Sequence, residues 1–228
     1  MNNKVDKKIY IVIPVYNEAP VICDTIKEVR EAGYENIIVV DDGSSDKSYF
    51  KFSQMDVVSL SLSLNRGKGA AVKTGIEAAK ILGADIVVTI DGDGQHNPMD
   101  IREMIKSIND EEYDVVLGTR LVDPKGMPWY KIIANHIGNF FTWVIYGLWV
   151  TDSQSGFRAY SRKAIDLINT KTDRYEYDSE VIREIGRHDL KYKEIPIEVR
   201  YTEYSMGKVN KQGIKNGIKT LIKMLISS

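Results

Sequence analysis

The sequence lacks several features that mark specialised classes of protein. Cys23 is the only cysteine among 228 residues, so no disulfide can form within the chain. Its 6 prolines and 17 glycines are too few for a collagen-like chain, and 43% hydrophobic residues are too many for a wholly disordered one. We therefore expect a globular fold whose length suits one large domain.

Long apolar segments are also missing. Residues 1–8 are polar and charged, so the sequence predicts no export signal. The longest nearly apolar run, residues 137–150, is interrupted by Asn139 and Thr142. It is shorter than the roughly 20 residues that a membrane-spanning helix needs. We expect a cytoplasmic protein without a spanning helix.

The formal net charge of -1 hides an uneven distribution, because residues 205–228 contain lysines but no acidic residues. Lysines and isoleucines both recur there at every fourth position, which predicts a helix with a basic stripe beside an apolar one. A second segment, about 129–148, is rich in aromatic residues. Both are typical of helices at a membrane interface, so we expect an anionic membrane surface as a partner and no nucleic acid. The alternative for the tail is a surface helix with solvated lysines.

Short apolar runs alternate with segments of helical spacing over the first half of the chain. Runs rich in Ile and Val predict buried strands at 9–15, 37–40, 86–90 and 115–117, with a weaker one at 57–62. Helical spacing occurs at 22–29, 72–79 and 101–108, and again in the second half at 176–187. We expect Pro20 and Pro98 in first helical turns, Asn97 as an N-cap, and Gly33 and Gly83 at helix ends. This alternation predicts an α/β fold, a mostly parallel sheet with helices on both faces.

Polar residues follow the predicted strands, at the edge where open parallel sheets bind ligands. Five acidic residues gather there without lysine neighbours in sequence, so they would repel one another. A divalent cation, or a ligand that donates hydrogen bonds, would relieve that repulsion. The acidic residues are Glu18, Asp41, Asp42, Asp91 and Asp93.

The Asp91-Gly92-Asp93 motif is the sharpest of these features. Two carboxylates at a strand end suit a hard cation, Mg²⁺ or Mn²⁺, that also binds phosphate oxygens. The alternative is a polar turn. A calcium loop is excluded, because Gln95 and His96 stand where an EF-hand needs Asp or Asn and then Gly.

Two other features carry weaker indications. Residues 65–69, NRGKG, precede a helical segment and could bind phosphate through backbone N–H groups, although a tight turn is an equal alternative. His96 and His136 have no partner at metal-ligand spacing, and we interpret both as polar residues rather than ligands.

Several motifs in order make the chain similar to the family 2 glycosyltransferases, which have a GT-A fold. Within that family the chain resembles the polyprenyl-phosphate sugar synthases. The motifs are IPVYNE (13–18), VDDGSSD (40–46), NRGKG (65–69), DGDGQHNP (91–98), GTR (118–120) and TDSQSGFR (151–158).

The resemblance implies one domain, with residues 1–120 binding a nucleotide sugar and residues 121–228 serving the acceptor and the membrane interface. It implies catalytic roles for Asp93, Asp152 and Arg120, and closure over the donor by Arg200 and Lys208. The implied nucleotide-sugar site comprises Pro14, Tyr16, Glu18, Asp41, Asp42, Ser44, Lys68, Asp91, Gly92 and Asp93. The implied metal ligands are Asp91, Asp93 and Gln95, and the implied contacts of the acceptor phosphate are Arg120, Lys131, Ser155 and Arg158.

The implied reaction moves one sugar, with inversion, from a UDP- or GDP-linked donor to a polyprenyl phosphate at the cytoplasmic membrane face. The resemblance also allows a membrane-spanning partner protein. One alternative is an acceptor hydroxyl on a growing glycan, for which Asp152 would be the general base. The other alternative is a module that binds a nucleotide sugar without turnover. A lipid phosphate needs no base, because it is largely dianionic at neutral pH.

Overall fold

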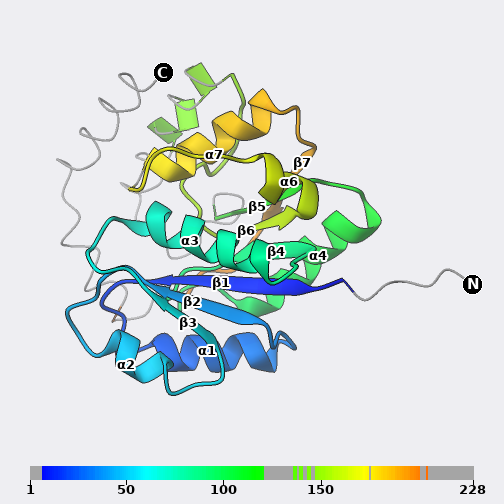
Figure 1. Cartoon of the computed structure of the whole chain (residues 1–228). Helices are drawn as coiled ribbons and strands as arrows, with labels where there is room; N and C mark the ends of the chain where they lie inside the picture. The colour runs from blue at the N-terminus through cyan, green and yellow to red at the C-terminus, as the bar shows by residue number, and fades with distance from the viewer. Residues whose placement is uncertain are drawn as a thin grey trace, which may run out of the picture.

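The computed structural model describes residues 7–120, 136–137, 139–140, 143–144, 147–174, 176–200 and 204. These residues build one seven-stranded sheet with the strand order β3-β2-β1-β4-β6-β5-β7. Figure 1 shows α1 and α2 on one side of β1, β2 and β3, and α3 on the other side. The predicted α/β class, with a mostly parallel sheet between helices, is confirmed.

The five predicted strands are all present, and the chain adds two that the sequence did not predict. All neighbouring strands pair in parallel except β6, which is antiparallel to both β4 and β5. The unpredicted strands, β6 and β7, are short and contain charged residues, so they lack the apolar run that marked the others. The strands are β1 (Ile9–Val15), β2 (Ile37–Asp41), β3 (Val58–Ser61), β4 (Ile86–Thr89), β5 (Val115–Thr119), β6 (Arg158–Ser161) and β7 (Tyr192–Pro196).

The four segments of helical spacing all form helices. The short helices α2 and α6 were not predicted, because few turns give little periodicity to detect. The helices are α1 (Ile22–Glu31), α2 (Ser48–Phe52), α3 (Lys68–Ile81), the 3₁₀ helix η1 (Pro98–Asp100), α4 (Ile101–Asp110), α6 (Arg162–Leu167) and α7 (Glu176–Arg187).

The helix boundaries follow most of the predicted signals. The Asn97 side chain accepts from the backbone N–H of Met99 and caps η1, whose first residue is Pro98. Gly33 and Gly83 follow α1 and α3 with positive φ, which glycine adopts without strain. The prediction for Pro20 was wrong, because α1 begins at Ile22 and Pro20 lies in the turn before it.

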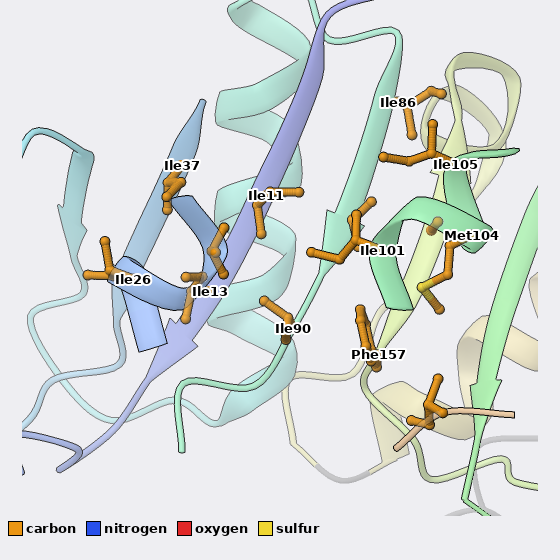
Figure 2. Close-up of a cluster of buried hydrophobic side chains, with 14 of the residues drawn as sticks. Ile11, Ile13, Ile26, Ile37, Ile86, Ile90, Ile101, Met104, Ile105 and Phe157 are labelled. Carbon is orange, nitrogen blue, oxygen red and sulfur yellow. The ribbon is translucent and has the colours of Figure 1, made fainter. Parts of the chain in front are cut away.

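The hydrophobic core forms two layers, one on each face of the sheet. Figure 2 shows the layer in which Ile11 and Ile13 of β1 face Ile26 of α1 and Ile101 of α4. The other layer packs alternate strand residues against α3, α6 and α7. Because β1 and β2 are buried on both faces, their sequences are continuous apolar runs rather than alternating ones. Two covered faces leave the loops at the strand ends as the place for a site.

The sheet order places a topological switch point between β1 and β4. The chain passes outward from β1 to β2 and β3, and then returns to β4 on the other side of β1. Ligands of open α/β sheets bind beyond the carboxyl ends of the strands at such a point. The residues that follow β1, β2 and β4 therefore surround the expected ligand position.

Several sequence predictions lie outside the described residues. They are the basic tail 205–228, Lys131, Lys208 and most of the aromatic segment 129–148. In the part of the chain that the structure describes, no helix combines the length and the hydrophobicity needed to cross a membrane.

Candidate functional site

The loop after β1 is held against the loop after β2 by side chains of both. Asn17, in the left-handed region with φ of 56°, accepts through Oδ1 from the backbone N–H of Ser45 at 2.9 Å. Ser44 Oγ accepts from the backbone N–H of Asn17 at 2.9 Å, and Ser48 Oγ accepts from that of Glu18 at 2.8 Å. The Glu18 carboxylate accepts from the Tyr204 hydroxyl at 2.9 Å. These bonds make one rigid wall from the predicted residues Glu18 and Ser44.

Asp41 has one unpaired carboxylate oxygen inside this wall. Its Oδ2 accepts from the backbone N–H of Ser44 at 3.0 Å and lies 3.3 Å from Ser61 Oγ. Its Oδ1 is buried and has no hydrogen-bond partner among the described residues. A buried acceptor without a donor is costly, so a ligand N–H at this position would be bound strongly. Next to it, Pro14 lies near the end of β1 and the Tyr16 side chain is 46% exposed, available to a flat ring.

Asp42 has a different role from Asp41, because both of its oxygens are engaged within the protein. Oδ1 accepts from the backbone N–H of Arg66 at 2.8 Å. Oδ2 accepts from Asn65 Nδ2 at 2.9 Å and from the backbone N–H of Gly67 at 2.8 Å. The backbone N–H groups of Arg66 and Gly67 are therefore used by Asp42, which holds the turn at 65–67.

Lys68, the first residue of α3, reaches across to Asp91 after β4. Its Nζ lies 2.6 Å from Asp91 Oδ1, and His96 Nε2 lies 3.5 Å from Asp91 Oδ2. Burial alone would raise the pKa of Asp91, but Lys68 and His96 together hold it far below its ordinary value. Burial would lower the pKa of Lys68, but Asp91 and Asp178 raise it above its ordinary value. Asp91 is therefore an anion, and Lys68 a cation, throughout the working pH range.

The loop 91–95 has the oxygen ligands that a divalent cation prefers. The backbone N–H of Gln95 donates to Asp93 Oδ1 at 3.1 Å, and Gln95 Nε2 donates to Asp93 Oδ2 at 2.6 Å. A Cβ on Gly92 would lie 3.0 Å from the Pro14 carbonyl, so the close packing of this loop against β1 favours glycine. The described residues contain no group of three or more His, Cys, Asp or Glu side chains that could hold a metal ion. Two carboxylates fit Mg²⁺ or Mn²⁺ only if a phosphate ligand supplies further oxygens, which is how such ions are commonly bound.

Arg120 and Asp152 form a bidentate pair at the other side of the site. Asp152 Oδ2 accepts from Arg120 Nε at 2.7 Å and from the Arg120 backbone N–H at 3.1 Å, and Oδ1 accepts from Nη2 at 2.8 Å. The Asp152 side chain is 0% exposed, whereas that of Arg120 is 24% exposed. The carboxylate thus orients a guanidinium that solvent can reach.

Arg158 lies inside the protein, and its Nη1 has no hydrogen-bond partner among the described residues. The residue is 1% exposed, and its guanidinium donates to the carbonyl oxygens of Ser153 and Ser155 at 2.8 Å each. Nη2 also lies 3.4 Å from Asp178 Oδ1. Ser155, another predicted phosphate contact, is 1% exposed, and its Oγ has no hydrogen-bond partner in the described parts of the chain. Arg158 belongs to β6, which pairs with β4 in the central sheet. Its guanidinium therefore ties the 151–156 loop to the sheet.

The backbone of Arg200 lies beside the site, but its side chain points away from it. Its backbone N–H donates to the Gln95 carbonyl at 2.7 Å, next to the acidic loop. Its guanidinium Nη1 lies 2.8 Å from Glu28 Oε2 on α1. In this conformation Arg200 does not close over a donor. Lys131 and Lys208 are outside the described residues.

Sequence reasoning missed several residues that position the site. His96 was interpreted as a polar loop residue, but it is buried and packs on Phe157 with ring centroids 5.1 Å apart while it approaches Asp91. Glu194 of β7 accepts from the backbone N–H and the Oγ1 of Thr151 at 2.8 Å each. The pairs of His96 with Phe157 and of Thr151 with Glu194 join residues that are distant in sequence, so no local spacing could have indicated them.

The comparison with protein families agrees with this geometry. The model of the family described as glycosyl transferase family 2 matches residues 10–168, which run from β1 through α6. The chain belongs to this family. The matched residues include the ends of β1, β2 and β4, whereas α7 and β7 lie beyond the match.

Individual family 2 proteins resemble the chain over most of its length. A UDP-N-acetylglucosamine–dolichyl-phosphate N-acetylglucosaminyltransferase of Methanococcus voltae is 37% identical, over 89% of this chain and 90% of that protein. A polyprenol monophosphomannose synthase of Mycolicibacterium smegmatis is 24% identical, over 91% of this chain and 83% of that protein.

A solved structure supports the fold assignment. Glucosyl-3-phosphoglycerate synthase from Mycobacterium tuberculosis, crystallised with Mn²⁺, uridine diphosphate and phosphoglyceric acid, superposes with a TM-score of 0.70. The match covers 97% of this chain and 79% of that chain at 19% identity, so it shows the fold alone. The chain has the GT-A fold that its motifs predicted.

Proposed function

We propose that this protein transfers one sugar, with inversion, from a nucleotide sugar to a polyprenyl phosphate at the cytoplasmic face of a membrane. Family 2 membership supports glycosyl transfer. The names of the Methanococcus and Mycolicibacterium relatives support a polyprenyl-phosphate acceptor. The main support for this acceptor is the pair of Arg120 and Asp152, in which Arg120 donates to both carboxylate oxygens. A hydroxyl acceptor would need a base at this position, whereas the pair offers an oriented cation, which suits a phosphate.

The donor occupies the switch point between β1 and β4 in this proposal. Tyr16 packs against the nucleobase, and Asp41 Oδ1 accepts from a base N–H, which both uracil and guanine offer. Glu18, Ser44 and Pro14 form the wall around the ribose. Asp42 supports this wall indirectly through the turn at 65–67.

The diphosphate lies between Lys68 and the acidic loop in this proposal. With a cation held by Asp91, Lys68 Nζ would contact a phosphate oxygen in place of Asp91 Oδ1. Asp91, Asp93 and the Gln95 side-chain oxygen would hold Mg²⁺ or Mn²⁺, with Gly92 keeping the loop close to β1. The cation supplies Lewis-acid stabilisation of the charge that develops on the leaving diphosphate.

The acceptor phosphate faces Arg120 in this proposal. A phosphate monoester has a second pKa near 6, so its oxygen is already a nucleophile at neutral pH and needs no base. Arg120, held by Asp152, orients this dianion, and Ser155 and Lys131 are its further proposed contacts. Arg158 acts from below by holding the loop that carries Ser155. Arg200 and Lys208 close over the donor after Arg200 leaves Glu28.

An exposed aromatic cluster supports the membrane location. Phe140, Trp143 and Trp149 are all exposed. The centroid of the Trp143 ring lies 6.0 Å from that of Phe140 and 5.8 Å from that of Trp149. Trp149 lies three residues before Asp152, so the cluster is close in sequence to the acceptor side. Aromatic side chains of this kind partition to the membrane interface, which brings the site to a lipid headgroup.

Replacing Asp152 with asparagine separates the two acceptor classes. The amide side chain of Asp152→Asn keeps an oxygen that accepts from Arg120, so we expect kcat/KM for the polyprenyl phosphate to fall about tenfold, the effect of weakening one charged hydrogen bond. The pH profile of kcat/KM should keep its shape. Rates of nucleoside diphosphate release between about pH 5.5 and 9, a range that spans the second pKa of the phosphate, measure both quantities.

The matched control is Asp166→Asn, which alters the exposed pair between Arg162 and Asp166, 2.9 Å apart, and should leave both quantities unchanged. A fall of about 10³-fold in Asp152→Asn with loss of the acidic limb of the profile would identify Asp152 as a general base. That result would favour the acceptor hydroxyl on a glycan over the lipid phosphate.

A further inference from the structure

The peptide groups on both sides of Asp152 are held by one side chain that no motif pointed to. Asn139 is 1% exposed. Its Oδ1 accepts from the backbone N–H of Ser153 at 2.9 Å and from Ser153 Oγ at 2.8 Å, and its Nδ2 donates to the carbonyl oxygen of Thr151. Asn139 thus binds the residue before Asp152 and the residue after it.

This arrangement fixes the direction of the Asp152 side chain. The Thr151 carbonyl and the Ser153 N–H belong to the two peptide units that flank the Asp152 Cα, so fixing both restricts its φ and ψ. The carboxylate then meets Arg120 with three hydrogen bonds of 2.7 to 3.1 Å. Such a bidentate geometry depends on direction as well as distance.

Two other side chains also hold this loop, but each of them binds one flank only. Glu194 of β7 binds Thr151, and Arg158 of β6 binds the Ser153 carbonyl. Both lie on strands of the central sheet. Asn139 alone among these three comes from the segment that carries the exposed aromatic cluster, since Phe140 is its neighbour. Asn139 is therefore the link between that surface and the pair of Arg120 and Asp152.

We propose that Asn139 is a positioning residue for the acceptor phosphate, acting through Asp152 on the direction of the Arg120 guanidinium. The inference rests on the proposed function, because it assigns Arg120 to the acceptor. It gives the aromatic segment a part in orienting the acceptor in addition to its part in meeting the membrane. Among the described residues, Asn139 makes no hydrogen bond to Asp41, Lys68 or Asp91, the residues proposed to bind the donor. Replacing Asn139 should therefore leave donor binding unchanged.

Replacing Asn139 with alanine tests the proposal through a split between the two substrates. We expect KM for the polyprenyl phosphate to rise about tenfold. KM for the nucleotide sugar and the calorimetric affinity for the nucleoside diphosphate with Mn²⁺ should stay within about twofold of wild type. His136→Ala, at an exposed position in the same segment, is the control and should match wild type.

A double-mutant cycle with Asp152→Asn decides whether Asn139 acts through Asp152. If it does, Asn139→Ala will change KM for the lipid less than about twofold in the Asp152→Asn background, because the direction of that side chain no longer matters as much. Additive effects, or an equal loss of donor and lipid affinity, would overturn the proposal. Asn139→Ser keeps a neutral hydroxyl at this buried position, so it should lie between wild type and Asn139→Ala, and it serves if the alanine variant does not fold.

The role of Asn139 and the identity of the acceptor are tested by different results. A wild-type enzyme that ignores polyprenyl phosphate and uses a sugar hydroxyl would refute the proposed acceptor. The same cycle, with KM measured for that hydroxyl acceptor, would still decide the role of Asn139, since additivity there would also overturn it.

Discussion

Asp91→Asn is expected to reduce sugar transfer about 10³-fold, the upper range for loss of a group that stabilises charge on a leaving oxygen. Asp91 is anionic because Lys68 and His96 hold its pKa far below the ordinary value. An amide in its place cannot neutralise a divalent cation and leaves Lys68 without its 2.6 Å partner. Nucleoside diphosphate release with saturating donor and lipid measures the loss, and Mn²⁺ titration in the presence of diphosphate should show weakened binding.

Asp24→Asn is the control for this experiment. Asp24 is an exposed carboxylate on α1 that lies 3.1 Å from Lys27, so its replacement should leave turnover and Mn²⁺ binding unchanged. Treatment of the wild-type protein with EDTA should reproduce the Asp91→Asn loss and be reversed by Mg²⁺ or Mn²⁺. Full turnover in Asp91→Asn, or wild-type activity that EDTA does not change, would show that the reaction does not depend on a metal held by Asp91.

Arg120→Lys is expected to lower kcat/KM for the polyprenyl phosphate about 10²-fold, because Lys keeps the charge but cannot make the bidentate contact. Arg120 donates to Asp152 through Nε and Nη2, at 2.7 and 2.8 Å. These two bonds fix the orientation of the planar guanidinium group. Lysine offers a single ammonium without that direction. KM for the nucleotide sugar should change less than about twofold, which assigns the loss to the acceptor.

Arg162→Lys makes the same chemical change in the exposed pair with Asp166 and should leave every kinetic constant at its wild-type value. Thermal unfolding of Arg120→Lys separates a folding defect from a kinetic one, since Asp152 is buried and depends on a cation partner. Equal losses for donor and acceptor would contradict the assignment of Arg120 to the acceptor phosphate.

The sequence predicted the first half of the fold well, because that half is built from local patterns. The apolar runs of β1, β2 and β4 are continuous, and the polar residues that follow them are adjacent in sequence. A parallel sheet brings its strand ends to one edge, so the placement of Asp41 and Asp91 at the same edge followed from topology alone.

The acceptor side could not be predicted in the same way. Strand β6 enters the sheet between β4 and β5, although it follows β5 in sequence, and this insertion buries Arg158. The burial of Arg158, and the bonds of its Nε and Nη2 to the carbonyls of Ser155 and Ser153, follow from the sheet order and could not be predicted from its motif position.

The repulsion expected among the acidic residues was also relieved differently from what the sequence indicated. No lysine neighbours Asp91 in sequence, yet Lys68 reaches it from the start of α3. Asp42 is likewise neutralised by backbone N–H groups at Arg66 and Gly67 rather than by a ligand. Both contacts join residues that are far apart in the chain, a separation at which spacing carries no information.

The most direct test of the proposed function is nucleoside diphosphate release by the purified protein with Mg²⁺ or Mn²⁺. UDP-glucose, UDP-N-acetylglucosamine and GDP-mannose are supplied in turn, each with and without a short-chain polyprenyl phosphate. The account predicts release from one of these donors that requires the lipid phosphate and yields a lipid-linked sugar. Release that proceeds equally without the lipid, or that requires a sugar acceptor instead, would contradict it.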